Sequence, residues 1–250
     1  IKYYHIKIIK IMSNKKIALV TGCNRGIGKA ILKKFLKNNI KVICLVRKLD
    51  KEIKKFSNNE KNIISILDLD ISDDLIVKKK FKKLYQKIDQ IDILVNNAGI
   101  PSGSITEMTS IENLKKIFDI NFFSQIKIIQ HSLRLLKKSN NGSIINIGSI
   151  SGLYPLRGNI AYGSSKAAFM YSTKVMSKEF ANYKIRVNCV APSVTNTSMT
   201  KFMSKQSIID LLKKSKLSKP ISVNEVAEKV MYLASDESKK INGKIIYKYG

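Results

Sequence analysis

The chain has 250 residues, and 46 Lys or Arg against 18 Asp or Glu give it a formal net charge of +28. Its 44% hydrophobic and 26% charged residues are ordinary for a globular domain with a full core. Nearly all of the positive charge is Lys, spread along many helix faces without interleaved aromatic residues, which argues against nucleic-acid binding as the main role. No run of residues has the length of a membrane span. The three cysteines show no paired or metal-binding spacing, so we expect a reducing, cytoplasmic setting with no metal site.

Residues 1–12 are too short and too charged to cross a bilayer, and they lack the small-residue cleavage site of a signal peptide. Met12 directly precedes the polar residues that lead into the first predicted strand. We therefore expect residues 1–12 to be an N-terminal extension or a translated upstream segment, and residues 13–250 to form one domain.

The first predicted strand, residues 17–20, runs into a glycine-rich turn and then into a helix that ends near residues 38–39. Glycines allow a tight turn and the close approach of a pyrophosphate, and the helix N-terminus offers free N–H groups. The pattern predicts half of a dinucleotide-binding unit, although such patterns also occur in turns without a ligand. The turn reads Thr21-Gly22-Cys23-Asn24-Arg25-Gly26-Ile27-Gly28.

The second predicted strand, residues 41–46, ends where an acidic residue would bind the ribose hydroxyls of NAD. Val46 and Arg47 stand there instead, and Arg25 lies in the first turn. Two guanidinium groups suit a 2′-phosphate, so we expect NADP. NAD stays the alternative, because basic residues at these positions also arise by chance in so lysine-rich a chain.

Polar residues follow the third and fourth predicted strands, residues 63–67 and 91–95. Asp70 can reach an adenine amino group from a strand end, and Asp73 is expected to cap a helix that continues to about residue 87. After the fourth strand, small and amide residues let the backbone pass close to a cofactor and tie neighbouring strands together. They are Asn96, Asn97, Ala98 and Gly99.

A long helix pattern covers residues 111–138 and has Asn121 in its middle. Asparagine is a poor helix-interior residue. We therefore expect Asn121 to have a purpose, such as bonding a backbone carbonyl at a kink. His131, farther along this pattern, is assigned no chemistry.

A β-branched run ends at Ser149, which places this hydroxyl at the carboxyl end of a buried strand. Tyr162 and Lys166 are four residues apart and would share one helix face. A Lys ammonium beside a phenol favours the phenolate, so we expect a lowered pKa of Tyr162 and proton transfer at a reacting carbonyl. Taken alone, the pair also fits an ordinary amphipathic helix.

The remaining pattern predicts a sheet with helices on it. Residues 198–219 are either a mobile lid over a substrate or an ordinary connecting helix. The other predicted elements are a helix at 162–181, a strand at 185–190, a turn at 191–197, a helix at 223–234 and a strand at 244–248.

Together, these motifs resemble the classical short-chain dehydrogenase/reductase family over residues 15–250. The resemblance is carried by Thr21-Gly-x-x-x-Gly-x-Gly, Asn96-Asn-Ala-Gly, Asn121, Ser149 and Tyr162-x-x-x-Lys166. It implies a single Rossmann-fold domain with a doubly wound, mostly parallel seven-stranded sheet and helices on both faces. It also implies hydride transfer between NADP(H), or less readily NAD(H), and a carbonyl or secondary alcohol.

The resemblance gives roles to four catalytic residues. Tyr162 would be the general acid or base, and Lys166 would lower its pKa and hold the nicotinamide ribose. Ser149 would bond the substrate oxygen, and Asn121 would hold a water that connects Lys166 to solvent. The implied cofactor contacts are Thr21, Gly22, Asn24, Arg25, Gly26, Ile27, Gly28, Arg47, Asp70, Ile71, Asn97, Ala98, Gly99, Tyr162, Lys166, Pro192, Val194 (through its backbone) and Thr197 (to the nicotinamide carboxamide).

The chain is similar to the 3-oxoacyl-[acyl-carrier-protein] reductases of that family, which implies an acyl-carrier-linked or small carbonyl substrate, and a homotetramer built partly on the helices at 111–138 and 162–181. Arg134 and Lys178 fall on these helices, where such enzymes present basic residues to an acidic carrier protein. The alternatives are a sugar, polyol or other secondary-alcohol dehydrogenase, and a non-catalytic NADP-binding regulator, a class in which the Tyr–Lys pair is usually broken. The chain departs from the family at Ser193, usually glycine, and at Lys248 and Tyr249.

Overall fold

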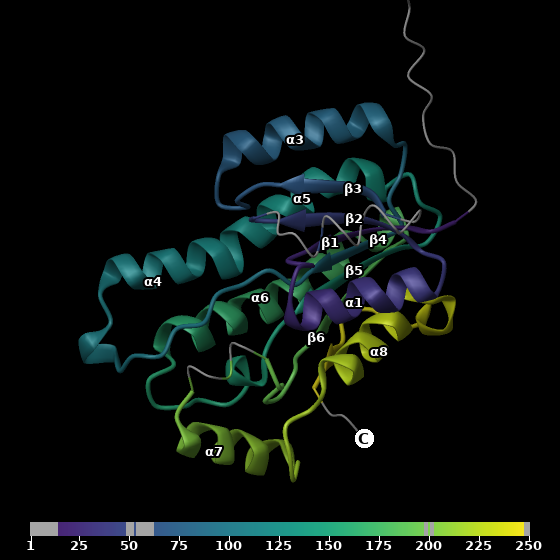
Figure 1. The fold of residues 1–250 in the computed structure, drawn as a ribbon. Coiled ribbons are helices and arrows are strands. Elements are labelled where there is room, and N and C mark those ends of the chain that lie inside the picture. The colour runs from purple at the N-terminus through teal and green to yellow at the C-terminus, as the bar shows by residue number, and fades with distance from the viewer. Residues whose placement is uncertain (1–14, 49–52, 54–62, 198–199, 201–202, 248–250) are drawn as a thin grey trace, which may run out of the picture.

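Parallel strands run through the middle of the molecule in the order β3-β2-β1-β4-β5-β6-β7 (Figure 1). The computed structural model describes residues 15–48, 53, 63–197, 200 and 203–247. Its strands are β1 (Ile17–Thr21), β2 (Lys41–Val46), β3 (Ile63–Asp68), β4 (Ile93–Asn96), β5 (Gly142–Ile147), β6 (Ile185–Val190) and β7 (Ile245–Ile246). Its helices are α1 (Gly26–Lys37), α3 (Asp74–Lys87), α4 (Ile111–Phe118), α5 (Ser124–Leu136), α6 (Ile160–Glu179), α7 (Lys205–Ser215) and α8 (Val223–Ala234).

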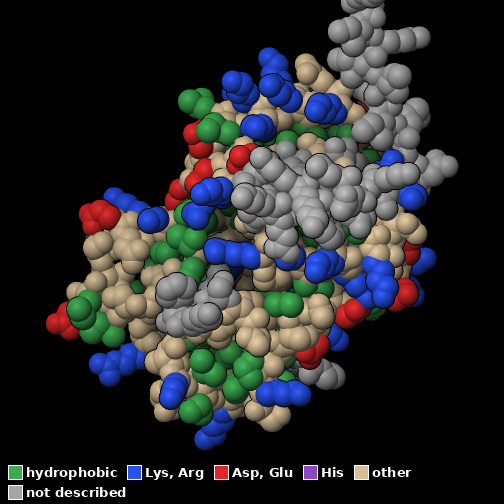
Figure 2. Space-filling view, in the orientation of Figure 1, with side chains coloured by type: hydrophobic (Ala, Val, Ile, Leu, Met, Phe, Trp, Pro, Cys, Tyr) green, Lys and Arg blue, Asp and Glu red, His purple; other side chains and the backbone are tan. Residues whose placement is uncertain are grey.

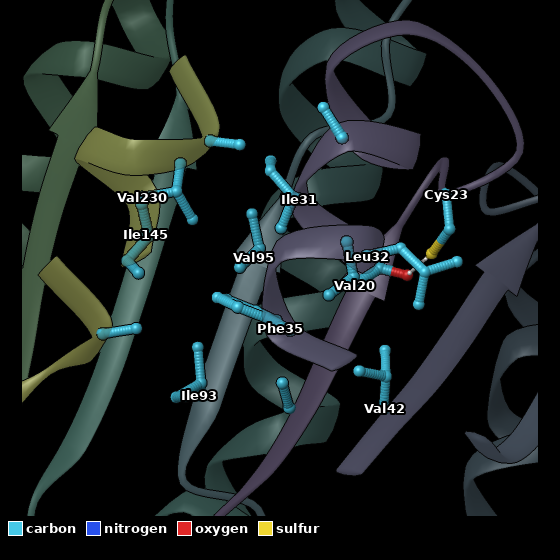
Figure 3. Close-up of a cluster of buried hydrophobic side chains, with 14 of the residues drawn as sticks. Val20, Cys23, Ile31, Leu32, Phe35, Val42, Ile93, Val95, Ile145 and Val230 are labelled. Atoms are coloured by element: carbon cyan, nitrogen blue, oxygen red, sulfur yellow. Dashed lines mark hydrogen bonds between the residues drawn. The ribbon is translucent and has the colours of Figure 1, made fainter. Parts of the chain in front are cut away.

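Successive strand residues point to opposite faces of the sheet, and helices pack on both faces, so the side chains on both are buried. Helices α1 and α8 cover one face, and α3, α5 and α6 cover the other (Figure 1). The cluster on the first face includes Val20, Ile31, Phe35, Val95 and Val230 (Figure 3). The cluster on the second face includes Leu19, Phe81, Leu94, Ile128 and Phe169. The predicted doubly wound, seven-stranded sheet is thus confirmed, and its strands are all parallel.

Side-chain amides tie the central strands together, as the sequence predicts. Asn96 Nδ2 donates to Asn146 Oδ1 across β4 and β5 at 2.9 Å. Asn146 Nδ2 in turn donates to Thr173 Oγ1 of α6, also at 2.9 Å. This buried chain of hydrogen bonds fixes β4, β5 and α6 relative to one another.

Several predicted elements match to the residue, namely those at 41–46, 185–190 and 223–234. Asp73 caps α3 as predicted, accepting a hydrogen bond from the Ile76 N–H. The long helix predicted at 111–138 is interrupted by a π-helical turn at Asp119–Phe123, between α4 and α5. The last strand is shorter than predicted, and residues 1–12, Lys248 and Tyr249 lie outside the described residues.

The basic side chains form no single patch on the face shown in Figure 2, where Lys and Arg are scattered over the described surface with Asp and Glu among them. Within the described ranges, no helix is both long and apolar enough to cross a membrane.

Arg186 provides a test of the packing between β6 and α8. Its buried guanidinium donates to the carbonyls of Leu233, at 2.9 Å, and Ser238, at 3.0 Å, where α8 ends. Arg186→Met leaves both carbonyls without this donor, so we expect the free energy of unfolding in urea to fall by about 2–4 kcal/mol.

The matched control is Lys174→Met, which removes an exposed positive charge from α6 and should change stability by less than about 0.5 kcal/mol. Equal losses in both variants would show that the buried hydrogen bonds of Arg186 contribute nothing specific.

Candidate active site

The glycine-rich turn after β1 leaves no room for side chains at two of its glycines. Gly22 has a φ of 70°, which favours glycine, and its N–H donates to the Leu45 carbonyl at 2.7 Å. A Cβ on Gly28 would lie 2.1 Å from the carbonyl oxygen of Gly22. Both glycines are therefore closely packed, Gly28 against the backbone of Gly22 and Gly22 against Asn97 and Ala98.

The N-terminus of α1 faces this turn with few competing groups. Arg25 is the N-cap residue, its backbone is extended and its side chain makes no capping hydrogen bond with a described residue. The first turn of α1 holds no acidic side chain. Thr197, from the loop after β6, also lies close to the start of α1. A Cβ placed on Gly26 would be 3.6 Å from the Cγ2 atom of Thr197. The arrangement suits an anion such as a pyrophosphate.

Thr21 braces the loop that follows β4. Its Oγ1 accepts hydrogen bonds from the N–H groups of Asn97 and Ala98, both at 2.9 Å. Asn97 returns the contact, since its Nδ2 donates to the carbonyls of Thr21 at 2.9 Å and Gly22 at 3.2 Å. The loops after β1 and β4 thus form one hydrogen-bonded unit.

Arg47 and Asp70 lie together at the carboxyl ends of β2 and β3. Asp70 Oδ1 accepts from the Ser72 N–H at 3.0 Å and its hydroxyl at 2.7 Å. The backbone N–H of Ser72 is the main cause that lowers the pKa of Asp70, and the charge of Arg47 lowers it further. The Asp70 carboxylate is therefore charged at neutral pH. The Arg47 side chain is exposed, so its guanidinium is accessible to a phosphate.

The other predicted cofactor residues fall around the same edge. Pro192 accepts a hydrogen bond from the Ile150 N–H at 2.9 Å, and the Val194 carbonyl accepts one from Ile221, also at 2.9 Å. Ser193, the departure from glycine, pairs its hydroxyl with that of Ser215 in α7 at 2.6 Å. Asn24 and Ile27 are half-buried in the turn, and Ile71 is buried in the core.

Ser149 and Tyr162 meet at the carboxyl end of β5. Ser149 Oγ accepts a hydrogen bond from the Ser151 N–H at 3.2 Å. Burial raises the pKa of the Tyr162 phenol, and the side-chain hydrogen bond to Ser149 opposes that rise without reversing it. The phenol is therefore protonated at neutral pH.

The lowered pKa expected for Tyr162 is thus not found in this structure. Lys166 does lie on the same helix, but its Nζ donates to the Ile147 carbonyl at 2.9 Å. Burial lowers the pKa of Lys166 to about 8. The spacing places the two residues on one face, whereas burial determines the direction of both pKa changes.

Asn121 lies in the π-helical turn and is fully buried. Its Oδ1 accepts from the Ile100 N–H at 2.9 Å, and its Nδ2 donates to the Ile100 carbonyl at 3.0 Å. The expectation that it bonds a backbone carbonyl at a kink is confirmed. A Cβ on Gly99 would lie 3.1 Å from Asn121 Oδ1 and 3.6 Å from Lys166 Nζ, so both groups border Gly99.

Two polar residues at this edge were missed by the sequence reasoning. Ser165 accepts from Asn121 Nδ2 at 3.2 Å and donates to the Tyr162 carbonyl at 2.8 Å, which links the π-helical turn to α6. Gln125 donates to the Ala98 carbonyl at 3.0 Å. In the sequence, only their positions suggested a role for these two residues: Ser165 directly precedes Lys166, and Gln125 lies four residues after Asn121.

A pocket of about 580 Å³ is lined by residues 105–107, by the segment 151–159 that follows Ser149, and by the start of α6. Its lining is amphipathic and includes Glu107, Ser151, Tyr154, Leu156, Arg157 and Ile160. Leu211 of α7 packs with Ile150 and Val194, so α7 contacts the segments that follow β5 and β6. Of the segment predicted as a lid or connector, residues 198–199 and 201–202 lie outside the described ranges. No group of His, Cys, Asp or Glu in the described chain could hold a metal ion.

The parallel sheet, the glycine turn and the Ser149–Tyr162–Lys166 edge define a doubly wound α/β protein of the dehydrogenase type. A family model described as short chain dehydrogenase matches residues 16–208. The chain belongs to this family of oxidoreductases.

Named relatives cover nearly the whole chain. It is 32% identical over 234 residues to a 3-oxoacyl-[acyl-carrier-protein] reductase of Thermotoga maritima, covering 92% of this chain and 95% of the relative. It is 32% identical to carbonyl reductase family member 4 of Xenopus tropicalis, with the same coverage of 92% and 95%. Among solved structures, 4-hydroxyisoleucine dehydrogenase complexed with NADH matches with a TM-score of 0.84 at 29% identity, covering 94% of this chain and 98% of that one. The ligand-free aldohexose dehydrogenase of Thermoplasma acidophilum matches with a TM-score of 0.78 at 26% identity, covering 93% and 92%.

The lowered pKa of Lys166 means that its buried charge lowers the free energy of unfolding at neutral pH. Below pH 8 the lysine is charged in both states, and its burial disfavours the folded one. Between the folded pKa of about 8 and the ordinary value of 10.5, the unfolded chain binds more protons, so stability rises with pH.

Lys166→Met should therefore raise the free energy of unfolding at pH 7, by less than the about 3 kcal/mol that the pKa change corresponds to, because the Ile147 carbonyl loses its Lys166 donor; the gain should shrink as the pH rises above 8. Urea unfolding at pH 7 and pH 9.5 measures it, with Lys174→Met on the same helix as control. A variant less stable than the wild type at pH 7 would contradict this reading.

Proposed function

We propose that the protein is an NADP-dependent carbonyl reductase with the chemistry of the 3-oxoacyl-[acyl-carrier-protein] reductases. The observation that carries the proposal is the meeting of Ser149, Tyr162 and Lys166 at the sheet edge that also holds the glycine turn. Family membership and the named relatives support it.

The residues around the turn fit a dinucleotide. The closely packed glycines and the N-terminus of α1 would hold the pyrophosphate, and Asp70 would accept from the adenine. Arg25 and Arg47 follow neighbouring strands and would bind a 2′-phosphate, which favours NADP over NAD. The loop from Asn97 to Gly99, with Pro192, Val194 and Thr197, would line the nicotinamide end. When bound, the nicotinamide supplies the hydride.

In this proposal Tyr162 is the proton donor. Its pKa is raised, so the phenol keeps the proton that a carbonyl oxygen takes up during reduction. Ser149 orients that oxygen by a hydrogen bond. Lys166 would hold the ribose hydroxyls and stabilise negative charge that develops on the phenol. Asn121 keeps the neighbouring loop in place through its bonds to Ile100.

The amphipathic pocket formed by residues 105–107, residues 151–159 and the start of α6 is compatible with a substrate that has both an apolar and a polar part. A secondary-alcohol dehydrogenase is the second candidate, favoured by the solved structures of a 4-hydroxyisoleucine and an aldohexose dehydrogenase. A non-catalytic regulator is disfavoured by the intact Tyr162–Lys166 pair. Assaying a panel of carbonyl compounds and alcohols by NADPH absorbance separates the first two candidates.

A docking role for Arg134 and Lys178 finds little support within one chain. Lys178 follows Tyr162 by sixteen positions on α6, which corresponds to about 24 Å along the helix. Arg134 lies in the last turn of α5 and stacks on the Tyr85 ring at 4.9 Å. A carrier protein bound at these positions would be remote from the Tyr162 of the same chain.

We also propose a homo-oligomer, a tetramer by family resemblance, in a cytoplasmic setting. The exposed apolar residues Phe123, Tyr171 and Val175, on the π-helical turn and α6, support contact between copies of the chain. The three cysteines are free and buried, which is compatible with a reducing compartment.

Removing the Tyr162 hydroxyl tests the proton donor. Tyr162→Phe should lower kcat for NADPH-dependent carbonyl reduction by at least about a hundredfold, because a positioned general acid is lost. NADPH affinity, measured by fluorescence titration, should stay within about threefold of the wild type. Near-normal turnover of the purified variant would rule out this role.

Arg47→Ala tests cofactor choice. Losing a charge-assisted contact to the 2′-phosphate should weaken NADPH binding about ten- to a hundredfold and leave NADH almost unchanged. Lys33→Ala, which removes an exposed charge from α1 away from the turn, is the control and should affect neither cofactor. Equal weakening of both cofactors by Arg47→Ala would show that this residue does not read the phosphate.

A further inference from the structure

Gln125 is a fully buried amide next to the candidate site, in the first turn of α5. Its Nε2 donates to two backbone carbonyls, those of Ala98 and Ile120, each at 3.0 Å. Ala98 belongs to the loop after β4, and Ile120 to the π-helical turn that carries Asn121. One side chain therefore joins the two segments.

The bond to Ile120 repairs a defect in the helix. In a regular α-helix the Ser124 N–H would donate to the Ile120 carbonyl. Here the Ser124 N–H donates to Asp119, five residues back, so the Ile120 carbonyl loses its usual donor. Gln125 supplies a replacement from its side chain. Turns of this kind are rare and frequent at functional sites, where they need local compensation.

The bond to Ala98 completes the fixing of the loop. Thr21 Oγ1 holds the N–H of Ala98, Gln125 holds its carbonyl, and Asn121 holds both backbone groups of Ile100. Gly99 lies between Ala98 and Ile100, the two residues held by these hydrogen bonds, and it borders Lys166. The position of the loop therefore depends on Thr21 and on two amides four residues apart, Asn121 in the π-helical turn and Gln125 in α5.

We propose that Gln125 is a positioning residue for catalysis: it stabilises the π-helical turn and keeps the loop around Gly99 in register with Asn121 and Lys166. This inference rests on the proposed function. The Oε1 atom of Gln125 accepts no hydrogen bond from any described residue, so the positioning depends on the donor side of the amide.

The test uses Gln125→Met, which keeps the length of the side chain and removes the donor. Ser132→Ala is the matched control, because Ser132 is buried on α5 and its hydroxyl has no hydrogen-bond partner among the described residues. For each variant, NADPH affinity, kcat, KM and Tm are measured, together with hydrogen exchange at residues 97–100.

With Gln125→Met we expect kcat to fall about tenfold or more and NADPH to bind about tenfold more weakly, since small displacements at a reaction centre are costly. KM for the carbonyl substrate should stay within about twofold, and residues 97–100 should exchange faster. Ser132→Ala should change none of these quantities. If Gln125→Met does not fold, Gln125→Leu, which also lacks a hydrogen-bond donor, takes its place.

Wild-type kcat, NADPH affinity and exchange in a folded variant would overturn the inference. So would a failure of both variants to fold, because Gln125 would then support the domain as a whole. A wild-type protein that binds neither NADPH nor NADH would refute the proposed function instead, and faster exchange at residues 97–100 in Gln125→Met would still support the positioning role.

Discussion

The candidate site depends on one constraint: β1, β4 and β5 are parallel neighbours, so their carboxyl ends meet at one edge of the sheet. Thr21 ends β1, Asn97 follows β4, and Ser149 lies two residues after β5. Segments that are far apart in the chain therefore converge without a dedicated structure of their own, at the point where the strand order reverses. The Asn96–Asn146 hydrogen bond then prevents the two central strands from sliding relative to each other.

Beside this edge, three polar side chains are fully buried: Asn121, Gln125 and Ser165. Buried amides and hydroxyls need partners within the protein. Asn121 and Ser165 bond each other and the backbone, and the Nε2 of Gln125 bonds two backbone carbonyls. Lys166 differs from these residues because it carries a charge, and its ammonium donates to the Ile147 carbonyl rather than to a carboxylate. Such a site lowers stability, and the apolar clusters on both faces of the sheet offset that loss.

Some elements have bounds that the sequence predicts to the residue, because their local sequence pattern and their tertiary packing favour the same structure. The helix at 223–234 has a capping box formed by Ser222 and Glu225, and the strand at 185–190 is buried along its whole length. The π-helical turn is different, because apolar residues continue on both sides of it and only Asn121 marks the position. Gln125 contacts a residue 27 positions away, and Ser165 one 44 positions away, distances that no local pattern contains.

The pKa of Tyr162 illustrates the same limit in chemical terms. A spacing of four residues predicts that Tyr162 and Lys166 share a helix face, and both residues lie on α6 as expected. It cannot predict that the Lys166 ammonium reaches back to the Ile147 carbonyl, nor that burial outweighs charge at the phenol. A buried phenol that stays protonated is suited to giving a proton. A positive charge brought next to it would lower its pKa and suit it to taking one. In the proposed function, an occupant that brings positive charge to this edge would therefore lower the pKa of Tyr162, and one that brings negative charge would raise it.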